Sequence, residues 1–248
     1  MELTDEQLLR YSRQILLPQF GIEGQERLSQ ATVVIFGLGG LGSPASLYLA
    51  ASGIGKLMLI DPDTVDLSNL QRQVVHNQTS IGLPKVASAQ QRLQQLNPSI
   101  QIEIQQEVLV GEALLAPIQQ ADLVLDCTDN LATRLAINAA CVQANKPLVS
   151  AAAIRFEGQV GVFHAKANSP CYQCFSGKLA ELPQTCSTNG VFGPILGVLG
   201  SMQALEAIKL LTHIGQSLIG RVLFFDALSM EWTTIRVPKR ADCPVCAK

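Results

Sequence analysis

The sequence predicts an α/β fold in which a mostly parallel sheet has helices on both faces and ends in antiparallel strands. Short apolar segments alternate with helical patterns from residue 32 onward, which is typical of βαβ units. A glycine-rich turn at 37–42 follows the first apolar segment and indicates a Rossmann-like unit. Two CxxC pairs, at 171–174 and 243–246, indicate a zinc site that fastens the C-terminal tail to this fold.

Local patterns predict the elements in order. Thr4 and Gln7 have capping-box spacing at the start of a helix over 4–17, before Pro18, and another helix is expected near 24–30. Strands are then expected at 32–36, 57–60, 100–104, 123–126 and 148–150, with helices near 43–52, 84–96, 111–119 and 130–144 between them. The remainder predicts a strand at 159–164, a polar cysteine-bearing loop at 168–190, a helix at 195–212 and strands at 221–226 and 231–237.

Composition limits the domain count and the class of partner. The 248 residues, 48% of them hydrophobic, fit a single domain, divided into N-terminal helices (1–30), a nucleotide-binding part (31–155) and a C-terminal part with the zinc site (156–248). The 18 basic and 20 acidic residues create no broad positive field for nucleic acid or an anionic membrane. The N-terminus is acidic, and no apolar run approaches a membrane span, so a cytoplasmic protein is expected.

The turn at 37–42 carries the motif GxGxxG between a strand and a helix. Backbone N–H groups and a helix N-terminus can bind phosphate there. Asp61 ends the next strand, 19 residues after Gly42, where a carboxylate can bind a ribose hydroxyl. A nucleotide is expected, but these residues alone leave NAD and ATP both open.

Polar residues further along the chain favour phosphate chemistry. Asn69 could be a turn former, and Arg72 and Lys85 could be surface charges. Together they supply the amide and cations that a triphosphate needs. Asp129 follows the fourth strand and could hold Mg²⁺, whereas Asp126 within that strand could be structural.

The three histidines, at 76, 164 and 213, show no triad-like arrangement. If the nucleophile of the reaction is a carboxylate, it is already ionised at pH 7 and needs no general base. Orientation and charge neutralisation could then suffice for catalysis.

Six strings in this order resemble the E1-like MoeB/ThiF family of sulfur-carrier adenylyltransferases: YSRQIL, GLGGLGS, DLSNLQRQ, PKVASA, LDCTDN and QALEAIKLL. The resemblance covers nearly the whole chain. It implies a homodimer in which Arg13 reaches the other protomer's ATP as an arginine finger. It also implies an ATP and Mg²⁺ site made by Gly39, Gly40, Asp61, Ser68, Asn69, Leu70, Gln71, Arg72, Lys85, Asp129 and Asn130.

The reaction that this resemblance implies is attack by the C-terminal glycine carboxylate of a small ubiquitin-like carrier on the α-phosphate of ATP. Arg13, Arg72, Lys85 and Asp129 with its Mg²⁺ would act on the phosphates. The resemblance implies that residues 156–248 bind the carrier. The carrier would be MoaD-like or ThiS-like, for molybdenum cofactor or thiamine biosynthesis, and the sequence leaves the pathway open. No rhodanese-like segment follows residue 248, so a separate sulfur donor protein is expected.

The seven cysteines fall into three groups. Cys171, Cys174, Cys243 and Cys246 form a complete set of ligands for structural zinc, with a redox pair or an iron–sulfur cluster as alternatives. Cys186 lies in a polar loop, and relatives have a cysteine there that is linked to capture of the activated carrier. Cys127 and Cys141 lie in apolar patterns and are expected in the core.

Two other functions remain open at this point. An NAD-dependent oxidoreductase with structural zinc would use the same glycine turn, but the sequence offers no recognisable hydride-transfer acid or base. A non-catalytic carrier-binding scaffold would not need the phosphate-binding residues.

Overall fold

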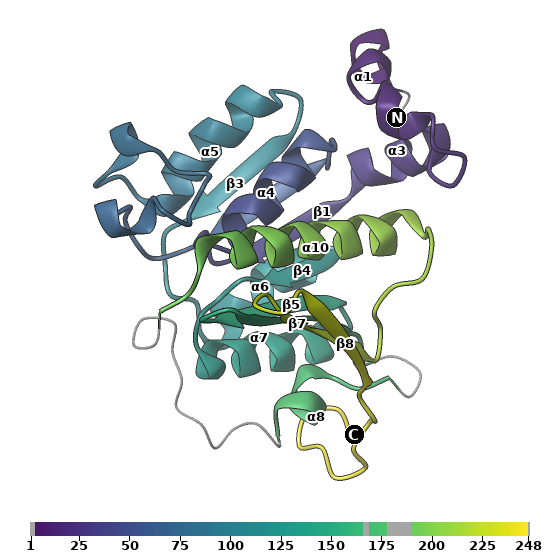
Figure 1. The fold of residues 1–248 in the computed structure, drawn as a ribbon. Helices are drawn as coiled ribbons and strands as arrows, with labels where there is room; N and C mark the ends of the chain where they lie inside the picture. The colour runs from purple at the N-terminus through teal and green to yellow at the C-terminus, as the bar shows by residue number, and fades with distance from the viewer. Residues whose placement is uncertain (1–2, 166–168, 178–189, 248) are drawn as a thin grey trace.

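The computed structural model describes residues 3–165, 169–177 and 190–247. Within this part of the chain, eight strands form one sheet in the order β3-β2-β1-β4-β5-β6-β7-β8 (Figure 1). Strands β1 to β5 are parallel, and β6 to β8 are antiparallel. Their bounds are β1 Thr32–Phe36, β2 Lys56–Ile60, β3 Gln101–Gln105, β4 Leu123–Asp126, β5 Leu148–Ile154, β6 Glu157–Phe163, β7 Arg221–Asp226 and β8 Glu231–Arg236. The predicted fold class is confirmed.

Helices cover both faces of the sheet. Helices α3 (Gly21–Gln30), α4 (Gly42–Ala51), α5 (Lys85–Leu96) and α10 (Gly193–Thr212) lie on one face. Helices α6 (Gly111–Gln120), α7 (Leu131–Ala144) and the short α8 (Tyr172–Ser176) lie on the other. The single-turn 3-10 helices η1 (Leu67–Asn69) and η2 (Gln78–Ser80) lie in the connection between β2 and α5.

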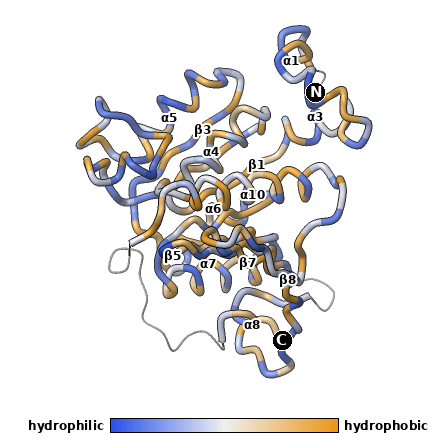
Figure 2. The backbone as a smooth tube through the Cα atoms, in the orientation of Figure 1, coloured by the Kyte–Doolittle hydropathy of each residue, from blue (hydrophilic) through white to orange (hydrophobic). Residues whose placement is uncertain are grey.

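Alternation along the central strands creates two hydrophobic cores. In β1, Val33 and Ile35 pack toward α4 and α10, whereas Val34 and Phe36 pack toward α6 and α7. Successive side chains of a strand point to opposite faces, and a sheet with helices on both sides must be apolar on both. Figure 2 accordingly shows hydrophobic colour along the central strands and hydrophilic colour along α5.

The N-terminal segment differs from its prediction. Thr4 does form a capping box with Gln7, but α1 (Asp5–Arg10) ends at Tyr11, and the separate α2 spans Ser12–Ile15. Tyr11 is buried and its hydroxyl accepts a hydrogen bond from Asn97 (2.8 Å). This anchor interrupts the helix, so the prediction of one helix over 4–17 was wrong.

Helix α10 begins two residues before its predicted start at 195, and it corrects the expectation that no apolar run approaches the length of a membrane span. It is the one helix among the described residues that is long and apolar enough to cross a membrane, and half of that window is buried inside the protein. Its contacts are with α3, α4 and strands β4 to β6. Gly200 permits the close approach to α4, because a Cβ there would lie 2.3 Å from the carbonyl oxygen of Leu41. The contacts are those of a core helix.

Candidate nucleotide-binding site

A cavity of about 690 Å³ opens at the carboxyl ends of β1 and β4. The chain leaves β1 toward β2 and β3 on one side, then returns to β4 on the other. Such a switch in strand order leaves a crevice where open α/β sheets bind ligands. The predicted residues that line this cavity are Gly39, Gly40, Asp61, Asn69, Arg72, Lys85, Asp129 and Asn130.

Two glycines of the turn occupy positions where a side chain would not fit. Gly37 has a φ of +91°, and a Cβ there would lie 2.8 Å from the carbonyl oxygen of Cys127 after β4. At Gly42, in the first turn of α4, a Cβ would lie 1.9 Å from the carbonyl oxygen of Gly37. Gly39 is different, because its Cβ would meet nothing closer than Gln73 at 3.7 Å. The free space beside Gly39 belongs to the cavity.

Asp61 connects the end of β2 to this turn. Its carboxylate accepts hydrogen bonds from the backbone N–H groups of Leu38 (2.6 Å) and Asp63 (2.9 Å). Burial raises the pKa of Asp61, while the positive charge of Lys85 and these two N–H groups act against that rise. Asp61 therefore helps to hold the turn in place as well as lining the cavity.

Lys85 and Arg72 supply cations from two different segments. Lys85 begins α5 and is buried, with its Nζ 2.7 Å from a carboxylate oxygen of Asp63. Arg72 is half-buried, and its guanidinium donates to the carbonyl oxygen of Ser68 (2.8 Å). Both side chains thus have defined positions at the cavity.

The opposite wall follows β4. Asp129 is exposed in the cavity, and its carboxylate makes no hydrogen bond or ion pair with the described part of the chain. Asn130 caps α7, because its side chain accepts a hydrogen bond from the N–H of Thr133 (2.9 Å). A carboxylate without a hydrogen-bond partner among the described residues is the kind of oxygen ligand that Mg²⁺ prefers.

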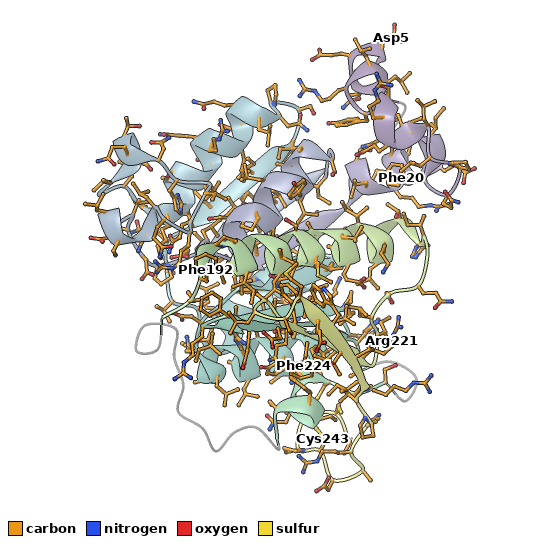
Figure 3. The ribbon with its side chains drawn as sticks, viewed as in Figure 1. Asp5, Phe20, Phe192, Arg221, Phe224 and Cys243 are labelled. Carbon is orange, nitrogen blue, oxygen red and sulfur yellow. The ribbon has the colours of Figure 1, made fainter. Side chains whose placement is uncertain are left out.

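The four predicted metal ligands do come together. Cys171 and Cys174 at α8 and Cys243 and Cys246 in the tail are buried, and their sulfur atoms all lie within 4.8 Å of one another. Figure 3 shows Cys243 beside α8, at the opposite end of the molecule from Asp5.

Their spacing fits a tetrahedral metal ion. The Sγ atoms of Cys171 and Cys243 are 3.7 Å apart, and those of Cys174 and Cys246 are 3.5 Å apart. Tetrahedral zinc with Zn–S bonds of about 2.3 Å places its sulfur ligands roughly 3.8 Å apart. Although burial acts against it, hydrogen bonds from the backbone N–H groups of Cys246 and Val245 lower the pKa of Cys243 to about 7. The donor set therefore fits zinc.

A model of the ThiF family matches residues 11–245. The chain belongs to the ThiF family. It is 47% identical to the molybdopterin-synthase adenylyltransferase of Salmonella typhimurium, covering 100% of this chain and 99% of that protein. It is 48% identical to the sulfur carrier protein ThiS adenylyltransferase of Escherichia coli, covering 98% and 97%. A solved structure of E. coli MccB with ATP superimposes with a TM-score of 0.82 at 25% identity, covering 96% of this chain and 74% of that one.

Some predicted residues of this ThiF-family chain lie outside the cavity. Ser68, Leu70 and Gln71 are not among the residues that line it. Arg13 is exposed on α2 and does not line it either. Cys186 lies outside the described residues. The cavity of this chain therefore contains most, but not all, of the predicted set.

Sequence reasoning missed two polar residues in the cavity wall. Gln73 is buried, and its Oε1 has no hydrogen-bond partner within the described residues. A buried acceptor without a partner is costly, so a ligand is the expected partner. Arg134 is the second, and a sequence signal existed: Arg134, Ile137, Asn138 and Cys141 are all buried at helical spacing on α7, which places a cation on the inner face.

The remaining histidine and cysteine predictions can also be compared with the structure. Cys127 and Cys141 are buried in the two hydrophobic cores, as expected. Asp126 is fully buried and accepts a hydrogen bond from Ser150 (2.7 Å), which agrees with a structural role. His76 is buried beneath the glycine turn.

Proposed function

We propose that this protein uses ATP to adenylylate the C-terminal glycine of a small ubiquitin-like sulfur-carrier protein, releasing pyrophosphate. The observation that carries the proposal is one cavity that brings Arg72, Lys85 and Asp129 together with the glycine turn. Both relatives named above that share this chain over almost their whole length are adenylyltransferases, and neither is an oxidoreductase. This supports nucleotidyl transfer over hydride transfer.

The residues suggest how the reaction proceeds. The glycine turn and Asp61 would bind the nucleotide, while Arg72 and Lys85 would neutralise charge that develops on the phosphates. Asp129 would hold Mg²⁺, which adds positive charge at the phosphates when it is bound. The nucleophile is a carboxylate that is already ionised at pH 7. Holding it in line with the α-phosphate is the main task left to the protein.

Three further features belong to the same proposal. The chain would act as a homodimer in which Arg13 contributes to the partner's site, which agrees with its exposure away from its own cavity. Residues 156–248 would contact the carrier. The four cysteines would bind zinc, which would tie the tail to α8 and have no part in the chemistry.

The pathway stays open between two carriers. One relative is named for molybdopterin synthase and another for ThiS, at almost equal identity. The carrier would be MoaD-like, ThiS-like or both, and a separate protein would donate sulfur.

The test is carrier-dependent ATP–pyrophosphate exchange, measured separately with each carrier. Exchange is expected with at least one of them in the presence of Mg²⁺, and exchange with neither would refute the proposal. Asp129→Ala is expected to abolish exchange. Glu112→Ala serves as the control, because Glu112 is an exposed carboxylate in the first turn of α6 and does not line the cavity. Normal exchange by Asp129→Ala would contradict the magnesium assignment.

A further inference from the structure

Arg134 is a buried cation beside Thr128 and Asp129 in the wall of the cavity. It lies in the first half of α7, its side chain is only 10% exposed, and part of it lines the cavity. Its Nε is 3.9 Å from the buried carboxylate of Asp126, and a terminal N–H group donates to the carbonyl oxygen of Thr128.

These contacts hold the segment from which Asp129 projects. Asp126 accepts hydrogen bonds from both the N–H (3.1 Å) and the hydroxyl (2.7 Å) of Thr128. Arg134 binds the carbonyl oxygen of the same residue. Thr128 is therefore held at both its donor and its acceptor groups, and the following residue, Asp129, has a defined place in the cavity.

Arg134 is itself held from the direction of the four-cysteine cluster. Helices α7 and α8 are in contact, and although burial raises the pKa of Tyr172, the nearby positive charge and side chain of Arg134 act against that rise. Tyr172 is buried at the start of α8, where its backbone N–H donates to the side chain of Asn138 on α7 (2.7 Å). Its ring packs edge-on against Phe163, with centroids 5.2 Å apart.

Helix α8 is also part of the cysteine cluster. Cys171 immediately precedes Tyr172, and Cys174 lies in the same helical turn. The two tail cysteines approach them at 3.7 and 3.5 Å. The position of the Tyr172 hydroxyl therefore depends on how α8 is held by the cluster.

We propose that Arg134 and Tyr172 are positioning residues through which the four-cysteine cluster fixes the Thr128–Asp129 wall of the nucleotide cavity. Metal bound by the four thiolates then has a second effect besides holding the tail: it keeps the nucleotide site in its binding geometry, and losing the metal weakens nucleotide binding. This inference rests on the proposed function, since it assumes that the cavity binds ATP.

The test is the Kd for Mg–ATP, measured by calorimetry, of the wild-type protein, Tyr172→Phe and Arg134→Lys. Tyr172→Phe removes one hydroxyl and keeps the ring, so α8 stays packed. Arg134→Lys keeps the charge, but a single ammonium group cannot replace the planar set of donors. Each variant is expected to raise the Kd about threefold to tenfold, the usual range for losing one hydrogen bond.

The double variant is expected to raise the Kd by less than the product of the two single effects, because Tyr172 acts through Arg134. Tyr48→Phe is the control, since Tyr48 is 57% exposed and does not line the cavity. Thermal unfolding is measured in parallel. Wild-type Kd values in Tyr172→Phe, or a Kd change matched by a general loss of stability, would overturn the proposal.

Metal removal tests the contribution of the cluster. Wild-type protein is stripped with a zinc-selective chelator, desalted and titrated with Mg–ATP, and its metal content is measured. The Kd is expected to rise as in Tyr172→Phe, and stripping Tyr172→Phe is expected to add little. An unchanged Kd in stripped wild-type protein would refute the link to the cluster. Failure of the intact wild-type protein to bind ATP would instead refute the proposed function.

Discussion

His76 makes the stability of this protein depend on pH in a direction that can be measured. The ring lies beneath the glycine turn with its Nε2 3.0 Å from the carbonyl oxygen of Leu38 and its Nδ1 2.8 Å from the hydroxyl of Ser88. A carbonyl oxygen can only accept, so Nε2 carries a proton, and in the neutral ring Nδ1 accepts from the Ser88 hydroxyl.

Burial, assisted by the positive charge of Lys85 and opposed by the hydrogen bond to Leu38, lowers the pKa of His76 from 6.5 to about 4. The unfolded chain therefore binds a proton more readily than the folded protein between these two values. The contribution of neutral His76 to the free energy of unfolding is fully present above 6.5, its pKa in the unfolded chain, and is lost as the pH falls from 6.5 toward 4. Lowering the pH from 7 to 5 is expected to cost about 2 kcal/mol, and reaching pH 4 about 3 kcal/mol.

The assay is urea unfolding at pH 7, 6 and 5, at one protein concentration, of the wild-type protein and His76→Gln. Glutamine can still donate to Leu38 but does not titrate. Its free energy of unfolding is expected to fall by about 2 kcal/mol less than that of the wild type between pH 7 and 5.

Contributions from other groups, including Asp61, are common to both proteins and cancel in the comparison. His213→Asn is the control, because His213 is exposed with a φ of +58°, a conformation that asparagine tolerates. Equal loss of stability in the wild type and His76→Gln would refute the reasoning.

Two other predictions concern the turn and the cysteine cluster. Gly39→Ala is expected to fold normally, since its Cβ meets nothing closer than 3.7 Å, but to weaken ATP binding. Gly42→Ala places a Cβ 1.9 Å from a backbone oxygen and is expected to lower the midpoint of thermal unfolding. Calorimetric titration and thermal unfolding distinguish them, and equal ATP affinity in Gly39→Ala and wild type would contradict the location of the phosphates. Metal removal is expected to lower the thermal midpoint of the wild type, because metal that binds only the folded protein stabilises it, and a Cys243→Ser variant is expected to show no such dependence on chelator.

The central sheet could be predicted because its signals are local. The strands at 32–36 and 123–126 match their predicted bounds, and the helix expected over 84–96 begins one residue later, at Lys85. Buried parallel strands are continuous apolar runs, and α5 and α6 have their apolar residues at helical spacing on one face. The helix over 4–17 failed because the interruption at Tyr11 comes from contacts with Asn97 and Ser99, which are distant in sequence.

The site was predictable to a similar extent. Asp61, Arg72 and Lys85 belong to motifs that a reader of the sequence can recognise, and all three line the cavity. Two sets of contacts were not predicted: the ion pair of Lys85 with Asp63, and the hydrogen bonds of Asp61 and His76 to the backbone of Leu38. Each set joins segments whose proximity depends on how β1, β2 and α5 pack.

The sequence by itself determined the fold class, the nucleotide-binding turn, the pairing of two CxxC motifs and the family, because these depend on residue types at short, fixed spacings. Only the tertiary structure decided that Arg134 lies behind Asp129 and that Tyr172 joins it to the cysteine cluster. The physical reason is packing: the spacing of Ile137 and Cys141 can place Arg134 on the inner face of α7, but only the contacts of α7 with β4 and α8 decide which groups it meets there.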